Sequence, residues 1–246
     1  MLVSIIIPSL NNLEKLKDCI SRIKDQTFDN YEVWIIDGNS SDGTKNYLQT
    51  LKNPFMWISR LDKGVYDAMN QGILQSKGKW LYFLGSDDKL YSKNTLAEVF
   101  KDQVSVNQKM IIGKIKYNYK KSDSFLLKKN DGIVKPSWTN QLWINNTLPH
   151  QSIFYNKELF IDKEYSLGYK ILADYAFNLH LFKKRNKVKI IDKIISICNT
   201  EGLSKNYNWK LYKEEIRIKT NESSLIYKPV FVLLALTKYL LKSIKL

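Results

Sequence analysis

The chain has 246 residues, 44% of them hydrophobic, which is enough for one large α/β domain with a substantial core. Its two cysteines are too few for a disulfide framework. The formal net charge of +15 suits an acidic partner, but no helix-turn-helix, zinc or RNA-recognition signature accompanies it, so we expect no nucleic-acid partner.

Strands and helices alternate over roughly the first hundred residues. We expect strands at residues 3–8, 31–36, 57–59 and 80–84, and helices at residues 13–23, 44–51 and 65–74. Polar loops follow the strands, with Asn and Ser residues that favour turns and helix N-termini. This order predicts a mostly parallel sheet with right-handed crossovers, whose polar loops lie at the carboxyl ends of the strands.

The apolar run over residues 80–84 ends in Gly85, Ser86, Asp87 and Asp88. Glycine and polar residues commonly end strands, so an ordinary turn is one interpretation. The other is that a buried strand delivers two carboxylates to the sheet edge where α/β proteins hold ligands. Carboxylates are hard oxygen ligands, so this second interpretation predicts a divalent metal and a diphosphate.

Four segments with this order and spacing resemble family 2 glycosyltransferases, which are inverting enzymes with the GT-A fold. They are residues 4–11, 36–44, 62–72 and 78–88. The resemblance extends to bacterial transferases of capsule, exopolysaccharide and O-antigen assembly. It implies one catalytic domain over residues 1–224, with a nucleotide-sugar half (1–105) and a smaller acceptor-side half (106–224). An amphipathic helix at residues 225–246 follows.

The resemblance implies that a nucleotide sugar, which we expect to be a UDP-sugar, lies across the loops after the first two strands. The residues implied at the donor are Pro8, Ser9, Asn11, Asp37, Asn39, Asp42, Asp62, Lys63, Asp67 and Asp87. Gly38 stands where relatives often carry a second acid, which leaves open which nucleotide base the donor carries. The alternative for residues 62–67 is that their charges are ordinary features of a helix start.

The resemblance also implies a metal ion and a base. Asp88 aligns with the metal-binding Asp-x-Asp motif, whose first position is Ser86, and would hold Mn²⁺ or Mg²⁺. His150 is a second candidate metal ligand, with a structural role as the alternative. Asp174, the one carboxylate in the apolar helix 171–182, is the candidate general base, although Ala173 replaces the acid that usually precedes it. A first-turn acid favoured by the helix dipole is the alternative for Asp174.

The second half of the chain matches relatives only in places. Residues 110–146 suggest a β-rich insertion in which Trp138 and Trp143 could stack on sugar rings, although aromatic residues are more often part of a core. Residues 200–204 resemble a loop that closes over the donor diphosphate. The apolar run in 225–246 is too short to cross a bilayer, so this helix either lies in the membrane interface or packs on the domain.

We therefore expect a metal-dependent glycosyltransferase of the hexosyltransferase type that acts in bacterial surface polysaccharide assembly. We expect the acceptor to be a saccharide or a polyprenyl-linked sugar. Because no signal peptide precedes the first strand, we expect the protein in the cytoplasm, where it would lie peripherally at the inner face of the cell membrane. A sugar-phosphate nucleotidyltransferase is an alternative, but residues 9–12 lack its glycine-rich basic loop. A non-catalytic basic adaptor for membranes or nucleic acid is another, and the acids at Asp37, Asp87, Asp88 and Asp174 argue against it.

Overall fold

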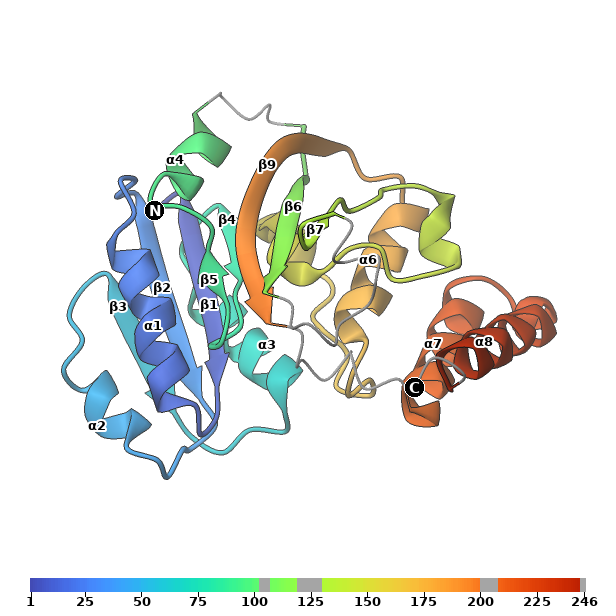
Figure 1. The fold of residues 1–246 in the computed structure, drawn as a ribbon, viewed down its shortest axis with the longest axis horizontal. Helices are drawn as coiled ribbons and strands as arrows, with labels where there is room; N and C mark the ends of the chain where they lie inside the picture. Colours follow the sequence, from blue (N-terminus) through green and yellow to red (C-terminus); the bar gives the residue numbers. More distant parts are fainter. Residues whose placement is uncertain (102–106, 119–129, 200–207, 244–246) are drawn as a thin grey trace.

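The computed structural model describes residues 1–101, 107–118, 130–199 and 208–243 (Figure 1). The strands are β1 (Val3–Ser9), β2 (Tyr31–Asp37), β3 (Phe55–Ser59), β4 (Trp80–Phe83), β5 (Lys89–Leu90), β6 (Met110–Asn118), β7 (Ile133–Val134), β8 (Ile153–Asn156) and β9 (Val188–Asn199). The α-helices are α1 (Leu13–Lys24), α2 (Thr44–Leu48), α3 (Val65–Gln75), α4 (Thr95–Phe100), α6 (Ala173–Lys183), α7 (Trp209–Glu222) and α8 (Lys228–Ser243). Short 3-10 turns are η1 (Asn140–Trp143), η2 (His150–Ser152), η3 (Lys157–Phe160) and η5 (Leu225–Tyr227).

The strands form one sheet in the order β3-β2-β1-β4-β8-β6-β9-β5, with β7 beside β6. The four strands β1 to β4 are parallel to one another, as the sequence predicts. Beyond β4 the sheet becomes mixed, because β8 pairs antiparallel with both β4 and β6, while β9 is parallel to β6 and antiparallel to β5. The long strand β9 curls across the sheet (Figure 1). The predicted α/β class is confirmed.

The N-terminal part of the sheet is covered on both faces, which explains why its strands are apolar throughout rather than alternating. Successive residues of β1 point to opposite faces: Ile5 and Ile7 belong to a core cluster with Ile20 of α1. Ile6 belongs to the other cluster, with Met69 of α3. This two-sided core fixes β1 and β4 at the centre of the molecule, so the loops at their carboxyl ends have a rigid support.

A second, aromatic-rich core lies between the sheet and α6. Phe160 of η3 and Phe177 of α6 stack with their ring centroids 4.5 Å apart, and Phe83 at the end of β4 packs edge-on against Phe160. Trp138 packs against Phe182 and Trp143 against Phe231. The two tryptophans therefore contribute to packing between α6, α8 and the segment that carries η1.

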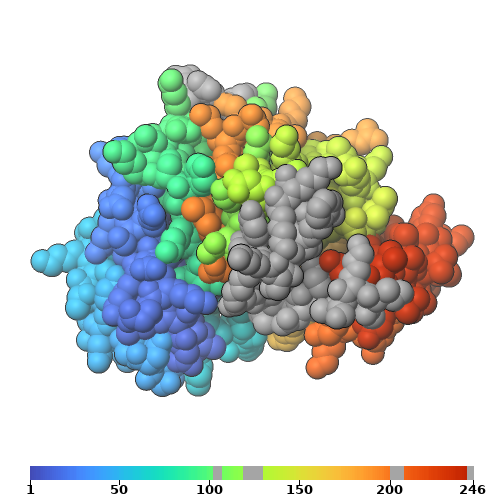
Figure 2. Space-filling model, viewed as in Figure 1, coloured from blue at the N-terminus to red at the C-terminus, as the bar shows by residue number. Residues whose placement is uncertain are grey.

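Helices α7 and α8 form the end of the molecule farthest from β3, and Figure 2 shows the C-terminal residues as a lobe at this end. One face of α8 packs inward, where Phe231 and Ala235 are buried in the core that contains Leu211 and Ile218 of α7. Among the described residues, no helix is both long enough and apolar enough to cross a membrane.

Candidate active site

A cleft of about 1030 Å³ crosses the molecule from the loops after β1 and β4, past the start of α6, to α7 and α8. Its lining includes Pro8, Asn12, Tyr66, Asp87, Asp88, His150, Gln151, Asp174, Asn199, Tyr212, Glu215, Lys238, Leu241 and Lys242. The cleft thus brings Asp88, His150 and Asp174 together, although they are far apart in the sequence. Of the implied donor residues, Pro8 and Asp87 also line it.

The turn after β4 folds both carboxylates back over Gly85. A Cβ atom at Gly85 would lie 2.6 Å from Asp88 Oδ2 and 3.1 Å from Asp87 Oδ1. Only glycine leaves room for this close approach, because any larger residue would push the carboxylates apart. The glycine in this motif therefore has a direct function in placing Asp87 and Asp88 beside each other.

Asp88 is almost completely buried and is held by two hydrogen-bond donors. Gln151 Nε2 donates to Asp88 Oδ2 at 2.9 Å, and the backbone N–H of Asn199 donates to Oδ1 at 3.1 Å. Burial and, to a smaller degree, the neighbouring Asp87 raise the pKa of Asp88 to about 6. The buried negative charge is therefore costly for this protein, and a cation at the carboxylate would relieve that cost.

The carboxylates around Asp88 fit a metal ion whose coordination is completed by a bound nucleotide. Among the described residues, no group of three or more His, Cys, Asp and Glu side chains is arranged to hold a metal ion on its own. Mg²⁺ and Mn²⁺ at nucleotide sites need only one or two carboxylates, because phosphate oxygens and water complete the coordination. Asp87 and Asp88 provide this number, and the raised pKa of Asp88 is the property that a bound cation would correct.

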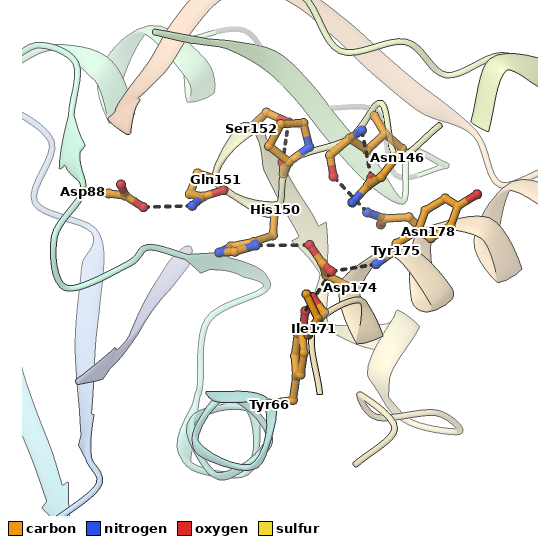
Figure 3. A network of polar contacts seen from close by, with 12 residues as sticks. Tyr66, Asp88, Asn146, His150, Gln151, Ser152, Ile171, Asp174, Tyr175 and Asn178 are labelled. Carbon is orange, nitrogen blue, oxygen red and sulfur yellow. Dashed lines mark hydrogen bonds and ion pairs between the residues drawn. The ribbon is translucent and has the colours of Figure 1, made fainter. Parts of the chain in front are cut away.

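Asp174 lies in the first turn of α6, with only 6% of its surface exposed (Figure 3). The hydroxyl of Tyr66 on α3 lies 2.9 Å from Asp174 Oδ1, and the backbone N–H of Tyr175 donates to the same oxygen at 2.8 Å. His150 Nδ1 lies 3.3 Å from Asp174 Oδ2. A carboxylate held from α3, η2 and its own helix has a fixed orientation in the cleft.

His150 lies between Asp174 and the Asp88 side of the site (Figure 3). The short turn η2 reaches both acids, because His150 contacts Asp174 and the next residue, Gln151, contacts Asp88. The structure therefore places the first ring nitrogen of His150 at Asp174 rather than at a metal. Its predicted role as a metal ligand would have to use the other ring nitrogen, Nε2, and stays a prediction.

The sequence did not point to Glu214, which fixes the start of α6. Its carboxylate on α7 accepts hydrogen bonds from the backbone N–H groups of Lys170 (2.7 Å), Ile171 (2.9 Å) and Leu172 (3.1 Å). Leu172 is the N-cap of α6 and its side chain makes no capping hydrogen bond. Glu214 supplies this cap from another helix, so it positions the helical turn that carries Asp174.

Two implied donor residues, Asp37 at the end of β2 and Asp42 in the loop that follows, hold this loop and its neighbouring segments together. Asp37 is buried, and its carboxylate accepts hydrogen bonds from Ser40 Oγ at 2.5 Å and Ser59 Oγ at 2.6 Å. Asp42 accepts from the backbone N–H of Leu13 at 2.9 Å and from Thr44 Oγ1 at 2.6 Å. These hydrogen bonds lower the pKa of Asp42. Both acids therefore shape the rim of the site in addition to any contact with a ligand.

Asparagine residues make the tight turns of the same rim. Asn11 and Asn39 have positive φ values of 47° and 67°, a conformation that Asn tolerates better than most residues. The side-chain oxygen of Asn11 accepts a hydrogen bond from the backbone N–H of Ser41 at 2.9 Å, which joins the loops after β1 and β2. Ser9 Oγ is buried and has no hydrogen-bond partner among the described residues.

Asp62, Lys63 and Asp67 lie at the start of α3. Asp62 Oδ1 accepts a hydrogen bond from the N–H of Gly64 at 2.8 Å, and Asp67 Oδ2 accepts one from the N–H of Lys63 at 2.9 Å. A Cβ atom at Gly38 would lie 2.9 Å from Asp62 Oδ2. Asp62 thus brings a carboxylate to the position where Gly38 contributes none. The resembling loop at residues 200–204 lies outside the described residues.

Comparison with known proteins places this geometry in context. The family model described as glycosyl transferase family 2 matches residues 4–184. A PGL/p-HBAD biosynthesis glycosyltransferase of Mycobacterium bovis is 35% identical over 73% of this chain and 69% of its own length. An uncharacterized glycosyltransferase of Mycobacterium tuberculosis is 29% identical over 72% of this chain and 67% of its own length.

Solved structures share the architecture at low sequence identity. S. aureus TarS 1-349 in complex with UDP superimposes with a TM-score of 0.67 at 17% identity, covering 96% of this chain and 70% of that one. The mannosyltransferase PcManGT of Pyrobaculum calidifontis, in complex with GDP-Man and Mn²⁺, gives a TM-score of 0.62 at 15% identity, covering 96% and 73%. The expected GT-A fold is confirmed, and the chain is a glycosyltransferase that belongs to glycosyl transferase family 2.

Proposed function

We propose that this protein is a metal-dependent, inverting glycosyltransferase that moves a sugar from a UDP-sugar to a hydroxyl of a saccharide or polyprenyl-linked acceptor. The observation that carries the proposal is that one cleft contains both a carboxylate pair suited to a metal and diphosphate, and a separate buried carboxylate suited to a base. Asp88 approaches this cleft from the turn between β4 and β5, and Asp174 approaches it from α6.

The donor end of the cleft is proposed to lie between the loops after β1, β2 and β4. Pro8 and Asp87 line the cleft there, and the buried, unpartnered Ser9 Oγ is a polar atom that a bound nucleotide would satisfy. Asp62, which lies against Gly38, is the proposed acid for the ribose or base. Related folds have been solved with UDP and with GDP-Man, which supports a nucleotide-sugar donor.

The proposed metal ion is Mn²⁺ or Mg²⁺, held by Asp88 with support from Asp87. When bound, it would supply the positive charge that stabilises the departing nucleoside diphosphate. The protein's own contribution is to present two carboxylates over Gly85 and to hold Asp88 through Gln151 and Asn199. A preformed, hydrogen-bonded arrangement limits the reorganisation needed when the donor binds.

Asp174 is the proposed general base that accepts the proton of the attacking acceptor hydroxyl. Tyr66 and His150 contact its two oxygens and fix the direction of its lone pairs. Holding the base in place before the acceptor arrives makes proton transfer depend on a small motion of the substrate only. Asp174 and the carboxylate pair at Asp88 reach the cleft from different parts of the chain, an arrangement that would suit the in-line displacement of an inverting transfer.

The proposed biological setting is bacterial surface polysaccharide assembly, in the cytoplasm at the inner face of the cell membrane. The relative from Mycobacterium bovis is named as a PGL/p-HBAD biosynthesis glycosyltransferase, which supports a role in a biosynthetic pathway. The cleft continues beyond Asp174 to Tyr212 and Glu215 on α7, which leaves room for an acceptor on that side.

A thermal-shift panel tests the donor and metal assignments together. UDP, GDP, dTDP and CDP are each added with and without Mn²⁺ to the wild type, to Asp88→Ala and to Asp162→Ala, whose exposed carboxylate is the matched control. We expect a Mn²⁺-dependent rise in melting temperature with UDP in the wild type and the control, and its loss in Asp88→Ala. Absence of a shift with every nucleotide would contradict the proposal.

A further inference from the structure

The η5 turn and helix α8 expose a concentrated set of large apolar side chains. We call this set the outer face, and it consists of Leu225, Ile226, Tyr227, Val230, Leu233, Leu236, Leu240 and Leu241, with exposed fractions between 40% and 77%. These eight are half of the 16 large apolar side chains that the described residues expose. Scattered exposed apolar residues are ordinary, but such a concentration on one helix marks an interaction surface.

The outer face is not needed for packing within the protein. Phe231 and Ala235, on the opposite side of α8, are buried against the core. Ile226, Val230, Leu233 and Leu240 follow one another at helical spacing on the exposed side. Helix α8 is therefore apolar on two sides, and the fold covers only one of them.

The charge around the outer face indicates which partner covers it. Lys228 is exposed beside this face and lines a groove on it together with Leu233 and Leu236. No acidic residue occurs over residues 225–243. Lys238 is used elsewhere, because it lines the cleft and pairs with Glu215. An exposed apolar face flanked by a lysine suits an anionic lipid surface, where a lysine near the headgroups contributes about 1 kcal/mol. A symmetric contact between two copies through this face would instead leave Lys228 without an acidic partner from residues 225–243 of the other copy.

We infer that the outer face of η5 and α8 docks on the surface of a membrane that contains anionic lipids. The helix lies in the interface rather than across the bilayer, in agreement with its length of 16 residues. The two possibilities that the sequence left open thus apply together, because one side of α8 packs on the domain and the other faces the lipid.

The same helix joins the membrane surface to the cleft. Leu241 belongs to the outer face and also lines the cleft. Lys238 and Lys242 of α8 line the cleft as well. If the proposed function is correct, on which this step depends, the cleft meets the membrane at α8. The hydroxyl of a lipid-anchored, phosphate-linked sugar would then reach Asp174 while the lipid anchor stays in the bilayer.

Vesicle co-sedimentation tests the inference with the full chain. Vesicles of phosphatidylcholine alone are compared with vesicles that also contain phosphatidylglycerol, at low and high salt. We expect the wild type to bind the mixed vesicles more tightly, with an affinity that falls as salt is raised. The triple variant Ile226→Gln, Val230→Gln, Leu233→Gln should weaken binding by at least about tenfold.

Two further variants make the test specific. Leu61→Gln combined with Leu74→Gln is the matched control, because these leucines are 79% and 68% exposed but lie away from the outer face, and it should bind vesicles as the wild type does. Lys228→Gln should weaken binding to the mixed vesicles by about fivefold and leave binding to neutral vesicles unchanged.

The inference is overturned if the wild type binds neither kind of vesicle, or if the triple variant binds as well as the wild type. It is also overturned if analytical ultracentrifugation shows a dimer that the triple variant converts to a monomer. UDP binding with Mn²⁺ is measured on the same proteins. Nucleotide binding without vesicle binding rejects the lipid inference alone, whereas vesicle binding without nucleotide binding rejects the proposed function alone.

Discussion

The carboxylates of this protein are used differently on the two sides of the cleft. On the donor side, Asp42 and Asp67 accept hydrogen bonds from backbone N–H groups of their own or adjoining loops. On the acceptor side, Asp174 and Glu214 join separate elements, since Asp174 contacts α3 and η2 while Glu214 on α7 holds the start of α6. Asp42 and Asp67 thus mainly hold turns that are close to them in the chain or in an adjoining loop, whereas Asp174 and Glu214 join elements that are far apart in the chain.

This difference explains how each side withstands change. A local hydrogen bond forms as soon as its loop closes, so it depends little on the rest of the fold. A contact between elements requires that both elements are already in place. Substitution of Asp42 or Asp67 should therefore disturb its own turn, whereas substitution of Glu214 should shift the turn that carries Asp174.

The largest effect is expected for Asp174→Asn. The amide keeps the shape of the side chain but cannot act as a general base near neutral pH, so the rate of sugar transfer should fall by about 10²- to 10⁴-fold. Metal-dependent UDP binding, measured by thermal shift, should remain at the wild-type level because the donor side is built separately. The exposed Asp162→Asn is the control. Transfer within a few fold of the wild type would remove Asp174 from the mechanism.

Gly78→Ala sharpens the comparison by changing a rigid long-range contact between the amino ends of the central strands, away from the cleft. A Cβ atom at Gly78 would lie 2.5 Å from the backbone nitrogen of Ser4 and 2.7 Å from the backbone carbon of Val3, both in β1. Because a central strand cannot move aside, we expect a loss of about 3 kcal/mol in the free energy of unfolding, measured with urea.

Gly168→Ala is the matched control for this change. Its Cβ atom would approach only the end of the Arg217 side chain, at 3.2 Å, and Ser166 Oγ, at 3.5 Å. A flexible side chain moves at little cost, so the free energy of unfolding should change by less than about 1 kcal/mol. Equal losses in the two variants would contradict the assignment of the Gly78 contact as rigid.

The smallest effect is expected for the stability of Asp88→Asn without metal. The folded protein raises the pKa of Asp88 from 3.8 to about 6, so the folded state binds this proton more tightly than the unfolded state does. The wild type therefore loses stability as the pH rises from about 4 to above 6, by roughly 2 kcal/mol, and the asparagine variant does not.

Urea unfolding in EDTA across this pH range measures that difference. The free energy of unfolding of Asp88→Asn relative to the wild type should increase as the pH rises. Adding Mn²⁺ with UDP above pH 7 should raise the free energy of unfolding of the wild type only, and so shift the difference back in favour of the wild type. A constant difference between the two proteins from pH 4 to pH 8 would show that burial of the Asp88 charge does not limit stability.

The sequence was sufficient for the local parts of the site. Strands β1, β2 and β4 and the carboxylates after β4 follow from apolar runs that end in polar loops, and α6 was expected close to its observed start. The partners of Asp88 were not predictable in this way. Gln and Asn residues carry no periodic signal, and Asn199 meets the turn only because β9 pairs antiparallel with β5, with Ile197 opposite Lys89.

The acceptor side shows the same limit more strongly. Tyr66 appears in the sequence as one residue of a helix, and Glu214 as a surface acid in a lysine-rich segment. Their functions appear only when α3 and α7 come to lie on either side of the start of α6. The exposed apolar side of α8 likewise requires knowledge of which side packs inward.

Because Glu214 caps α6, the two acids of the cleft are positioned by different parts of the protein. Asp88 is held in the turn after a central strand, whereas the turn before Asp174 is fixed by three hydrogen bonds to Glu214 on α7. A slight tilt of α7 would shift Asp174, the proposed base, relative to Asp88, the proposed metal ligand, while the sheet stayed still. The distance between these two acids thus depends on how a peripheral helix is seated.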